Sequence, residues 1–149
     1  MPEPTPEVIT LRLPSRLELL SVLDRVTLLV CERVGLDEDA SSMFSMSVLE
    51  AGTNAVQHGH KKDPTKVFQT EFRMHPDRLE VVVSDQGEGF DLAPTEHDIT
   101  SPEHLLDSRG RGIFIMRASC DAVDFEISEH GTLCRLVKFR SAAPRAADA

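Results

Sequence analysis

The chain has 149 residues, of which 40% are hydrophobic and 28% are charged, as is usual for a single globular domain with a full core. Its net charge of −9 argues against nucleic acid as the main partner, because phosphate backbones bind basic surfaces. No apolar run approaches the ~20 residues of a membrane span, and the acidic, proline-rich start is unlike a secretory signal.

Three cysteines, Cys31, Cys120 and Cys134, stand far apart and form no CxxC pair. An odd number of separated cysteines favours neither a disulfide framework nor a zinc site. We therefore expect buried free thiols in a reducing compartment, and hence a cytoplasmic protein.

The first part of the chain predicts a strand followed by two helices. Val8–Leu13 is short and rich in β-forming residues, which favours an edge strand closed by Pro14. An apolar stripe at helical spacing follows and ends near Gly35. A second helix is predicted from Asp37 to Gly59, because acidic residues in its first turn suit the helix dipole.

The second part predicts four strands and one further helix. The strands are expected at Lys66–Met74, Leu79–Ser84, Val123–Ile127 and Leu133–Phe139, and the helix at Gly112–Ala118. Asp91–Ser108 has no clear periodicity and is long for a passive connection. The layout predicts an α+β fold, a two-layer sandwich in which helices cover one face of a mixed, mostly antiparallel sheet.

We expect one folded domain over residues 8–140. Residues 1–7 would form a disordered N-terminus, and the Ala/Pro-rich residues 141–149 a flexible tail. The sequence shows no internal repeat and no low-complexity block that would indicate a second unit.

The second predicted helix carries the pattern Glu50-Ala-Gly-Thr-Asn54-Ala-Val-Gln-His58-Gly59. Glu50 and Asn54 are four residues apart and share one helical face. That pair suits a site where the carboxylate handles a proton and the amide oxygen holds a metal, and an ordinary solvated helix face would show the same spacing. We do not expect a zinc site made by His58 and His60, since residues two apart do not share a helix face.

Three glycine clusters follow this helix. Asp85-Gln-Gly87-Glu-Gly89 ends a buried strand, where an aspartate can accept the amino group of a purine and glycines let the backbone approach a flat ring. Arg109-Gly110-Arg111-Gly112 opens a helix, where free N–H groups and two cations favour an anion. His130-Gly131-Thr132 stands at a hairpin. Taken alone, each cluster has an ordinary structural explanation. The first also fits an Asp-Gly turn, the second a flexible hinge before a helix, and the third a hairpin turn.

In this order and spacing, the motifs resemble the Bergerat ATP-binding fold of the GHKL superfamily, the histidine-kinase-like ATPase domain. That superfamily includes gyrase, histidine kinases and the MutL repair proteins. Within it, the sequence is similar to the small anti-sigma-factor serine/threonine-protein kinases of bacteria over roughly residues 8–139. Four elements carry the resemblance: E-x-x-x-N on a helix, D-x-G-x-G, G-x-G and a final G-T.

The resemblance implies an ATP site built from these motifs. Glu50 would be the catalytic base that takes a proton from a protein serine, and Asn54 would hold Mg²⁺ at the ATP phosphates. Asp91–Ser108 would form the lid over ATP. The other residues assigned to the nucleotide are His58, Asp85, Gly87, Gly89, Gly110, Gly112 and Thr132.

Arg109 and Arg111 depart from the family's pattern. The family often carries a basic residue ahead of the G-x-G glycines with a small residue between, whereas here the cation is displaced by one position and Arg111 stands at the centre of G-x-G. A phosphate contact by either arginine is therefore a hypothesis based on charge and proximity.

The resemblance also implies a function. The protein would be an ATP-dependent protein serine kinase and anti-sigma factor that phosphorylates an anti-anti-sigma partner of the STAS type and sequesters a sigma factor. It would bind neither nucleic acid nor membrane directly, and a homodimer is a possible state. The alternative is a nucleotide-gated protein-binding regulator with little or no kinase activity, which would use ATP to set the shape of its partner surface.

Overall fold

The computed structural model describes residues 4–59, 65–85, 108–128 and 131–140, with backbone alone at 58–59, 108–113 and 127–128. Within these ranges, five strands form one sheet: β1 (Glu7–Pro14), β2 (Val67–Met74), β3 (Arg78–Asp85), β4 (Ala122–Ser128) and β5 (Gly131–Phe139). Their spatial order is β1-β2-β3-β5-β4, and each neighbouring pair is antiparallel. The α+β class is confirmed, and the described sheet is antiparallel throughout rather than mixed.

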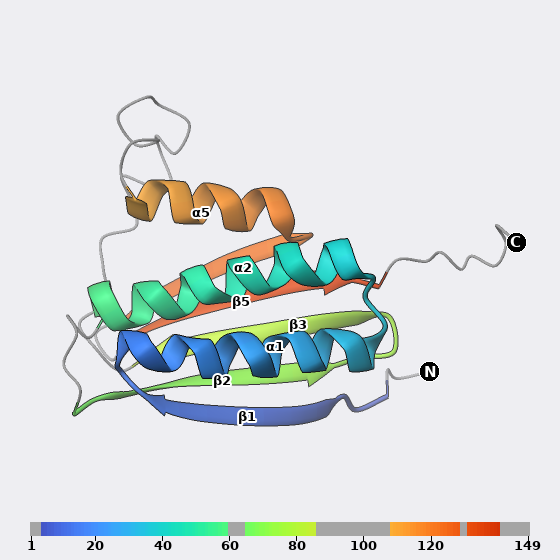
Figure 1. Cartoon of the computed structure of the whole chain (residues 1–149), viewed down its shortest axis with the longest axis horizontal. Coiled ribbons are helices and arrows are strands. Elements are labelled where there is room, and N and C mark those ends of the chain that lie inside the picture. Colours follow the sequence, from blue (N-terminus) through green and yellow to red (C-terminus); the bar gives the residue numbers. More distant parts are fainter. Residues whose placement is uncertain (1–3, 60–64, 86–107, 129–130, 141–149) are drawn as a thin grey trace, which may run out of the picture.

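The helices lie along one face of the sheet (Figure 1). They are a short 3₁₀ turn (Leu17–Leu19), α1 (Leu20–Val34), α2 (Glu38–Asn54) with a π-helical turn after it (Ala55–Gly59), and α5 (Ser108–Ser119). No helix in the described part of the chain is long and apolar enough to cross a membrane. The two-layer arrangement follows the prediction.

A tight link joins α1 to α2. Gly35 ends α1 with a left-handed φ of 96°, a conformation that glycine adopts without strain. Asp37 then caps α2, because its carboxylate accepts a hydrogen bond of 2.8 Å from the backbone N–H of Ala40. The link turns the chain back, so that α1 and α2 run side by side over the sheet (Figure 1).

The hydrophobic core fills the space between the helices and the sheet. Its largest fully buried side chains include Phe44, Phe68, Phe72, Leu23, Leu79, Met116 and Leu136. Gly52 lets α1 and α2 approach closely: a Cβ on this residue would lie 2.7 Å from Leu23 Cδ2 and 3.0 Å from Leu20 Cδ2. Close packing of α1 against α2 therefore explains why a glycine stands in the middle of a helix.

The other face of the sheet carries a row of charges, the charge ladder, formed by Arg73, Glu80, Arg135 and Asp124. Glu80 contacts both arginines, and Arg135 reaches Asp124 at 2.7 Å. His75 Nε2 lies 3.2 Å from Glu80 Oε1. Burial by itself raises the pKa of Glu80, but hydrogen bonds from Arg135 and His75 and the charges of Arg135 and Arg73 outweigh it and hold that pKa below its ordinary value.

The three thiols are free, as expected. Cys31 and Cys134 are buried, and Cys120 is partly buried. Burial raises the pKa of the Cys31 and Cys120 thiols to about 11, and it also raises that of Cys134. At neutral pH all three are therefore protonated.

Candidate functional site

Asp85 and Thr132 meet where β3 ends and β5 begins. They stand opposite each other in the β3–β5 register, and the Thr132 hydroxyl donates a hydrogen bond to Asp85 Oδ2. Both residues are buried, with 7% and 9% of their surface exposed. Since a carboxylate has about four acceptor positions, Asp85 can hold this hydrogen bond and also accept an N–H group from a ligand.

Asn54 stands close by, at the last residue of α2. It is 5% exposed, and its amide nitrogen Nδ2 has no hydrogen-bond partner among the described residues. A buried polar atom without a partner costs about 1–3 kcal/mol. A 180° rotation of the Asn54 side-chain amide would exchange its nitrogen and oxygen, and so place the oxygen where Nδ2 now lies. The residue therefore fits a role toward a group from outside the chain, a metal ion among them.

These three residues line one small hollow between α2 and the sheet. Its lining consists of Ala51, Asn54, Ala55, Val83, Asp85, Phe125, Thr132, Leu133 and Cys134. The hollow measures about 10 Å³, which is room for about one water molecule. A flat ring of purine size would therefore enter only when the lining side chains move apart.

Six residues of this lining were not among the predicted site residues: Ala51, Ala55, Val83, Phe125, Leu133 and Cys134. Val83 and Cys134 lie two residues from Asp85 and Thr132 along their strands, so the alternation of side chains places them on the same face. Phe125 comes from β4, where it pairs with Cys134. The period of two could have revealed the first pair, whereas Phe125 depends on which strands are neighbours.

Glu50 lies one turn before Asn54 on the same helix, as the spacing predicted. It is partly exposed and stands apart from the lining of the hollow.

The π-helical turn at Ala55–Gly59 follows Asn54 and contains the backbone of His58. The sequence predicted a helix up to Gly59, and the helix extends that far with a wider last turn. Such turns are rare and often occur at functional sites.

α5 begins at Ser108, four residues before the predicted start at Gly112. Arg109, Gly110 and Arg111 thus belong to its first turn instead of preceding it. Residues of a first turn can be helical without an upstream carbonyl partner, which explains why the glycines do not delay the helix. The leading N–H groups have no acceptor within the helix, and the positive end of the helix dipole lies there. This end of α5 and the end of α2 lie toward the same side of the molecule (Figure 1).

Gly87 and Gly89 lie outside the described residues, as do His60 and residues 91–107 of the predicted lid. The described part of the site therefore consists of Glu50, Asn54, Asp85, Thr132 and the backbone at the start of α5.

The chain matches known proteins over most of its length. A family model, the histidine kinase-like ATPase domain, matches residues 13–138. The serine-protein kinase RsbW of Bacillus licheniformis is 32% identical over 139 residues, which are 89% of this chain and 86% of that protein. The serine-protein kinase RsbW of Bacillus subtilis (strain 168) is 33% identical over 123 residues, 78% of this chain and 76% of that protein.

A solved structure shares the fold. The crystal structure of the RsbU and RsbW domains of Rv1364c from Mycobacterium tuberculosis superposes with a TM-score of 0.62 at 14% sequence identity. The match covers 89% of this chain, which spans 32% of that longer chain.

Proposed function

Because this chain belongs to the histidine kinase-like ATPase family and, within it, to the RsbW serine-protein kinases, we propose that it is an ATP-dependent protein serine kinase that also acts as an anti-sigma factor. It transfers phosphate to a serine of a STAS-type anti-anti-sigma partner. Phosphorylation releases that antagonist and frees the kinase to hold a sigma factor. We place the ATPase domain at residues 8–140 and its activity in the cytoplasm.

The buried Asp85–Thr132 pair is the observation that supports ATP binding most. It offers a buried carboxylate acceptor at the end of β3, in the lining of the hollow, suited to the exocyclic amino group of adenine. Gly87 and Gly89 would shape the same end, since they follow Asp85 directly in sequence. His58 would lie beside the nucleotide.

Asn54 and the start of α5 would serve the phosphate end. Asn54, whose Nδ2 has no partner among the described residues, would hold Mg²⁺ through its amide oxygen once the amide turns over. Mg²⁺ when bound would neutralise phosphate charge. The first turn of α5, with Gly110 and Gly112, would bind phosphate oxygens through its free N–H groups. Arg109 and Arg111 would add two cations there.

Glu50 would be the general base. As the serine oxygen forms its bond to the γ-phosphorus, Glu50 takes the hydroxyl proton, and the bond between that phosphorus and the bridging oxygen breaks to release ADP. Its partial exposure suits a base that must meet a serine on another protein.

The replacement Glu50→Gln tests this proposal. We expect phosphoserine formation on a co-purified partner to fall by about 10²-fold or more, because the amide cannot accept the proton, while ATP affinity stays within about twofold. Glu32→Gln on the exposed side of α1 is the matched control and should leave both quantities unchanged. The readouts are mass spectrometry of the partner and calorimetric ATP titration.

Full transfer by Glu50→Gln would contradict the assigned base. Robust ATP binding by the natural chain with no transfer to any captured partner would favour the nucleotide-gated regulator instead.

A further inference from the structure

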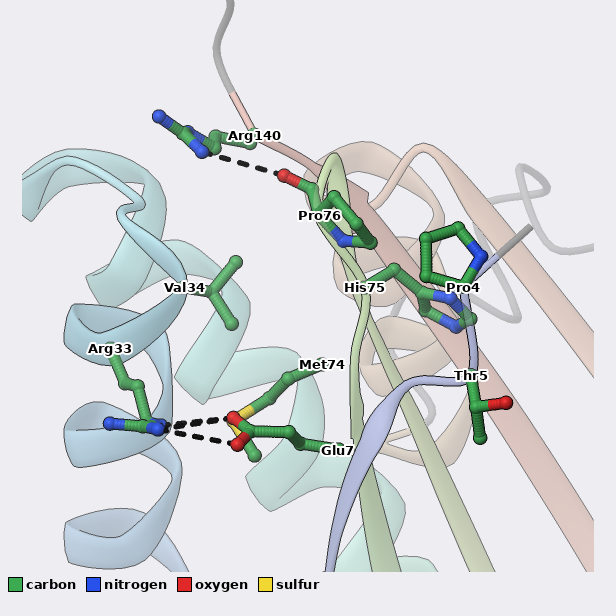
Figure 2. Close-up of a pocket in the computed structure, with 9 residues that line it drawn as sticks. All are labelled: Pro4, Thr5, Glu7, Arg33, Val34, Met74, His75, Pro76 and Arg140. Atoms are coloured by element: carbon green, nitrogen blue, oxygen red, sulfur yellow. Dashed lines mark hydrogen bonds and ion pairs between the residues drawn. The ribbon is translucent and has the colours of Figure 1, made fainter.

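A second hollow, of about 500 Å³, lies at the opposite end of the molecule from Asp85. Figure 2 shows it between the end of α1, the start of β1 and the turn that joins β2 to β3. Its lining includes Glu7, Arg33, Met74, His75, Pro76 and Arg140. Because Pro76 precedes β3 and Asp85 ends it, the length of a strand separates this hollow from the candidate nucleotide site.

Two guanidinium groups border this hollow. Arg33, in the last turn of α1, pairs with Glu7 at 3.1 Å, and Arg140, just after β5, donates one hydrogen bond of 3.4 Å to the carbonyl of Pro76. A guanidinium has five N–H donors in a planar fork, so these interactions leave donors on both residues. The lining thus contains two guanidinium groups and one carboxylate, on a chain whose net charge is −9.

His75 contributes a buried polar atom to the same lining. Its side chain is 10% exposed, and Nε2 lies 3.2 Å from Glu80 Oε1. A carboxylate accepts hydrogen bonds, so Nε2 carries the hydrogen in the neutral ring and Nδ1 is an acceptor. Nδ1 has no partner among the described residues. Because Nδ1 is itself buried, a ligand group reaches it only when the His75 ring turns toward the hollow.

We propose that this hollow binds a small organic anion. Its carboxylate or phosphate group meets one of the two guanidinium groups, that of Arg33 or that of Arg140, which lie at opposite ends of the hollow (Figure 2). Its apolar body packs against Val34, Met74 and Pro76. The volume lies within the range of about 300–1,000 Å³ that is usual for small-molecule sites. Charge-assisted, bidentate contacts from arginine favour an oxyanion over a neutral molecule of the same shape.

Four probes separate the chemistries in titrations of the full chain, followed by NMR of arginine and histidine side chains. Benzoate and phenyl phosphate offer the two anionic groups on an apolar body, inorganic phosphate lacks the body, and benzyl alcohol lacks the charge. We expect saturable binding of benzoate or phenyl phosphate, with inorganic phosphate and benzyl alcohol at least about tenfold weaker. Absence of saturable binding by both anionic aromatics overturns the proposal.

Arginine variants locate the binding. Arg140→Gln should weaken the better probe about tenfold, and Arg33→Gln provides a second, independent variant. Arg12→Gln, on an exposed residue of β1 outside the hollow, is the control and should stay within about twofold. An equal loss in Arg12→Gln, or displacement of the probe by ATP, would show that the anion binds elsewhere.

Discussion

At the scale of single residues, two buried threonines make a natural comparison. The Thr132 hydroxyl donates to the Asp85 carboxylate, whereas the Thr70 hydroxyl has no partner among the described residues. Both residues lie on the helix-facing side of the sheet and both are buried. A comparison of the two residues therefore separates the contribution of one hydrogen bond to stability from the contribution of burial.

We predict that Thr132→Val lowers the free energy of unfolding by about 1–3 kcal/mol and weakens ATP binding, because Asp85 loses the donor that holds it. Thr70→Val removes an unpaired hydroxyl and should leave stability unchanged or raise it, with ATP affinity unaltered. Urea unfolding and calorimetric ATP titration measure the two effects. Equal behaviour of the two variants would mean that the Thr132 hydroxyl has no special role.

The residues of the candidate site were only partly predictable from the sequence. The spacing of Glu50 and Asn54 is local, so a helix assignment is enough to place them on one face. The contact between Thr132 and Asp85 joins residues 47 positions apart. It depends on the pairing of β3 with β5, which hydrophobic periodicity does not encode. Motif resemblance indicated the two residues without indicating that they touch.

At the scale of elements, the approach of α1 to α2 depends on Gly52. Replacement by alanine should gain about 1 kcal/mol of helix propensity. It should lose about 1–3 kcal/mol by overpacking, since the new methyl group would press on the fully buried Leu23. We predict a net loss for Gly52→Ala and a larger loss for Gly52→Val, measured as lower urea midpoints.

Ser42→Ala on the exposed side of α2 is the control for helix propensity and should raise stability by a few tenths of a kcal/mol. If Gly52→Ala were as stable as the Ser42→Ala control, α1 and α2 would be able to separate at little cost, and the packing argument would be wrong.

Element types were predictable, but their ends were less so. Alternating or β-branched runs located the strands to within one or two residues, from β1 to β5. The start of α5 was placed four residues too late, because the apolar pattern begins only at Gly112, whereas a first turn needs no apolar residues. No pattern of residues predicts the π-helical turn after Asn54.

At the scale of the whole molecule, the charge ladder links four strands across the face opposite the helices. Its central residue, Glu80, has a pKa below its ordinary value of 4.5. The folded state therefore favours the charged form. The stability that Glu80 contributes is fully present above pH 4.5 and is lost as the pH falls through the lower pKa of the folded state.

We predict that Glu80→Gln lowers the free energy of unfolding at pH 7 by about 1–3 kcal/mol, since two arginines and a histidine lose a charged partner. As the pH falls below 4.5, the free energy of unfolding should decrease less in the variant than in the natural protein. Glu126→Gln on the exposed side of β4 serves as the reference. Parallel pH–stability curves for the natural protein and Glu80→Gln would rule out the ladder as an acid-sensitive element.

The strand order could not be derived from the pattern of residues alone. Hairpins predict that consecutive strands are neighbours, yet β5 lies between β3 and β4. This insertion brings Thr132 to Asp85 and Arg135 to Glu80, so both the candidate site and the charge ladder depend on it. The order of predicted helices and strands gave the α+β class and the helices on one face of the sheet, but not the order of the strands within it.

The buried, protonated thiols have a practical consequence for following motion in this protein. Maleimide dyes attack thiolates, and burial suppresses that form at Cys31, Cys120 and Cys134. A single cysteine introduced on an exposed position of α1 should take up a fluorophore at neutral pH while the native sulfur atoms stay unlabelled. Fluorescence measurements of conformational change could then use the natural sequence with one added cysteine, without first replacing the three native cysteines.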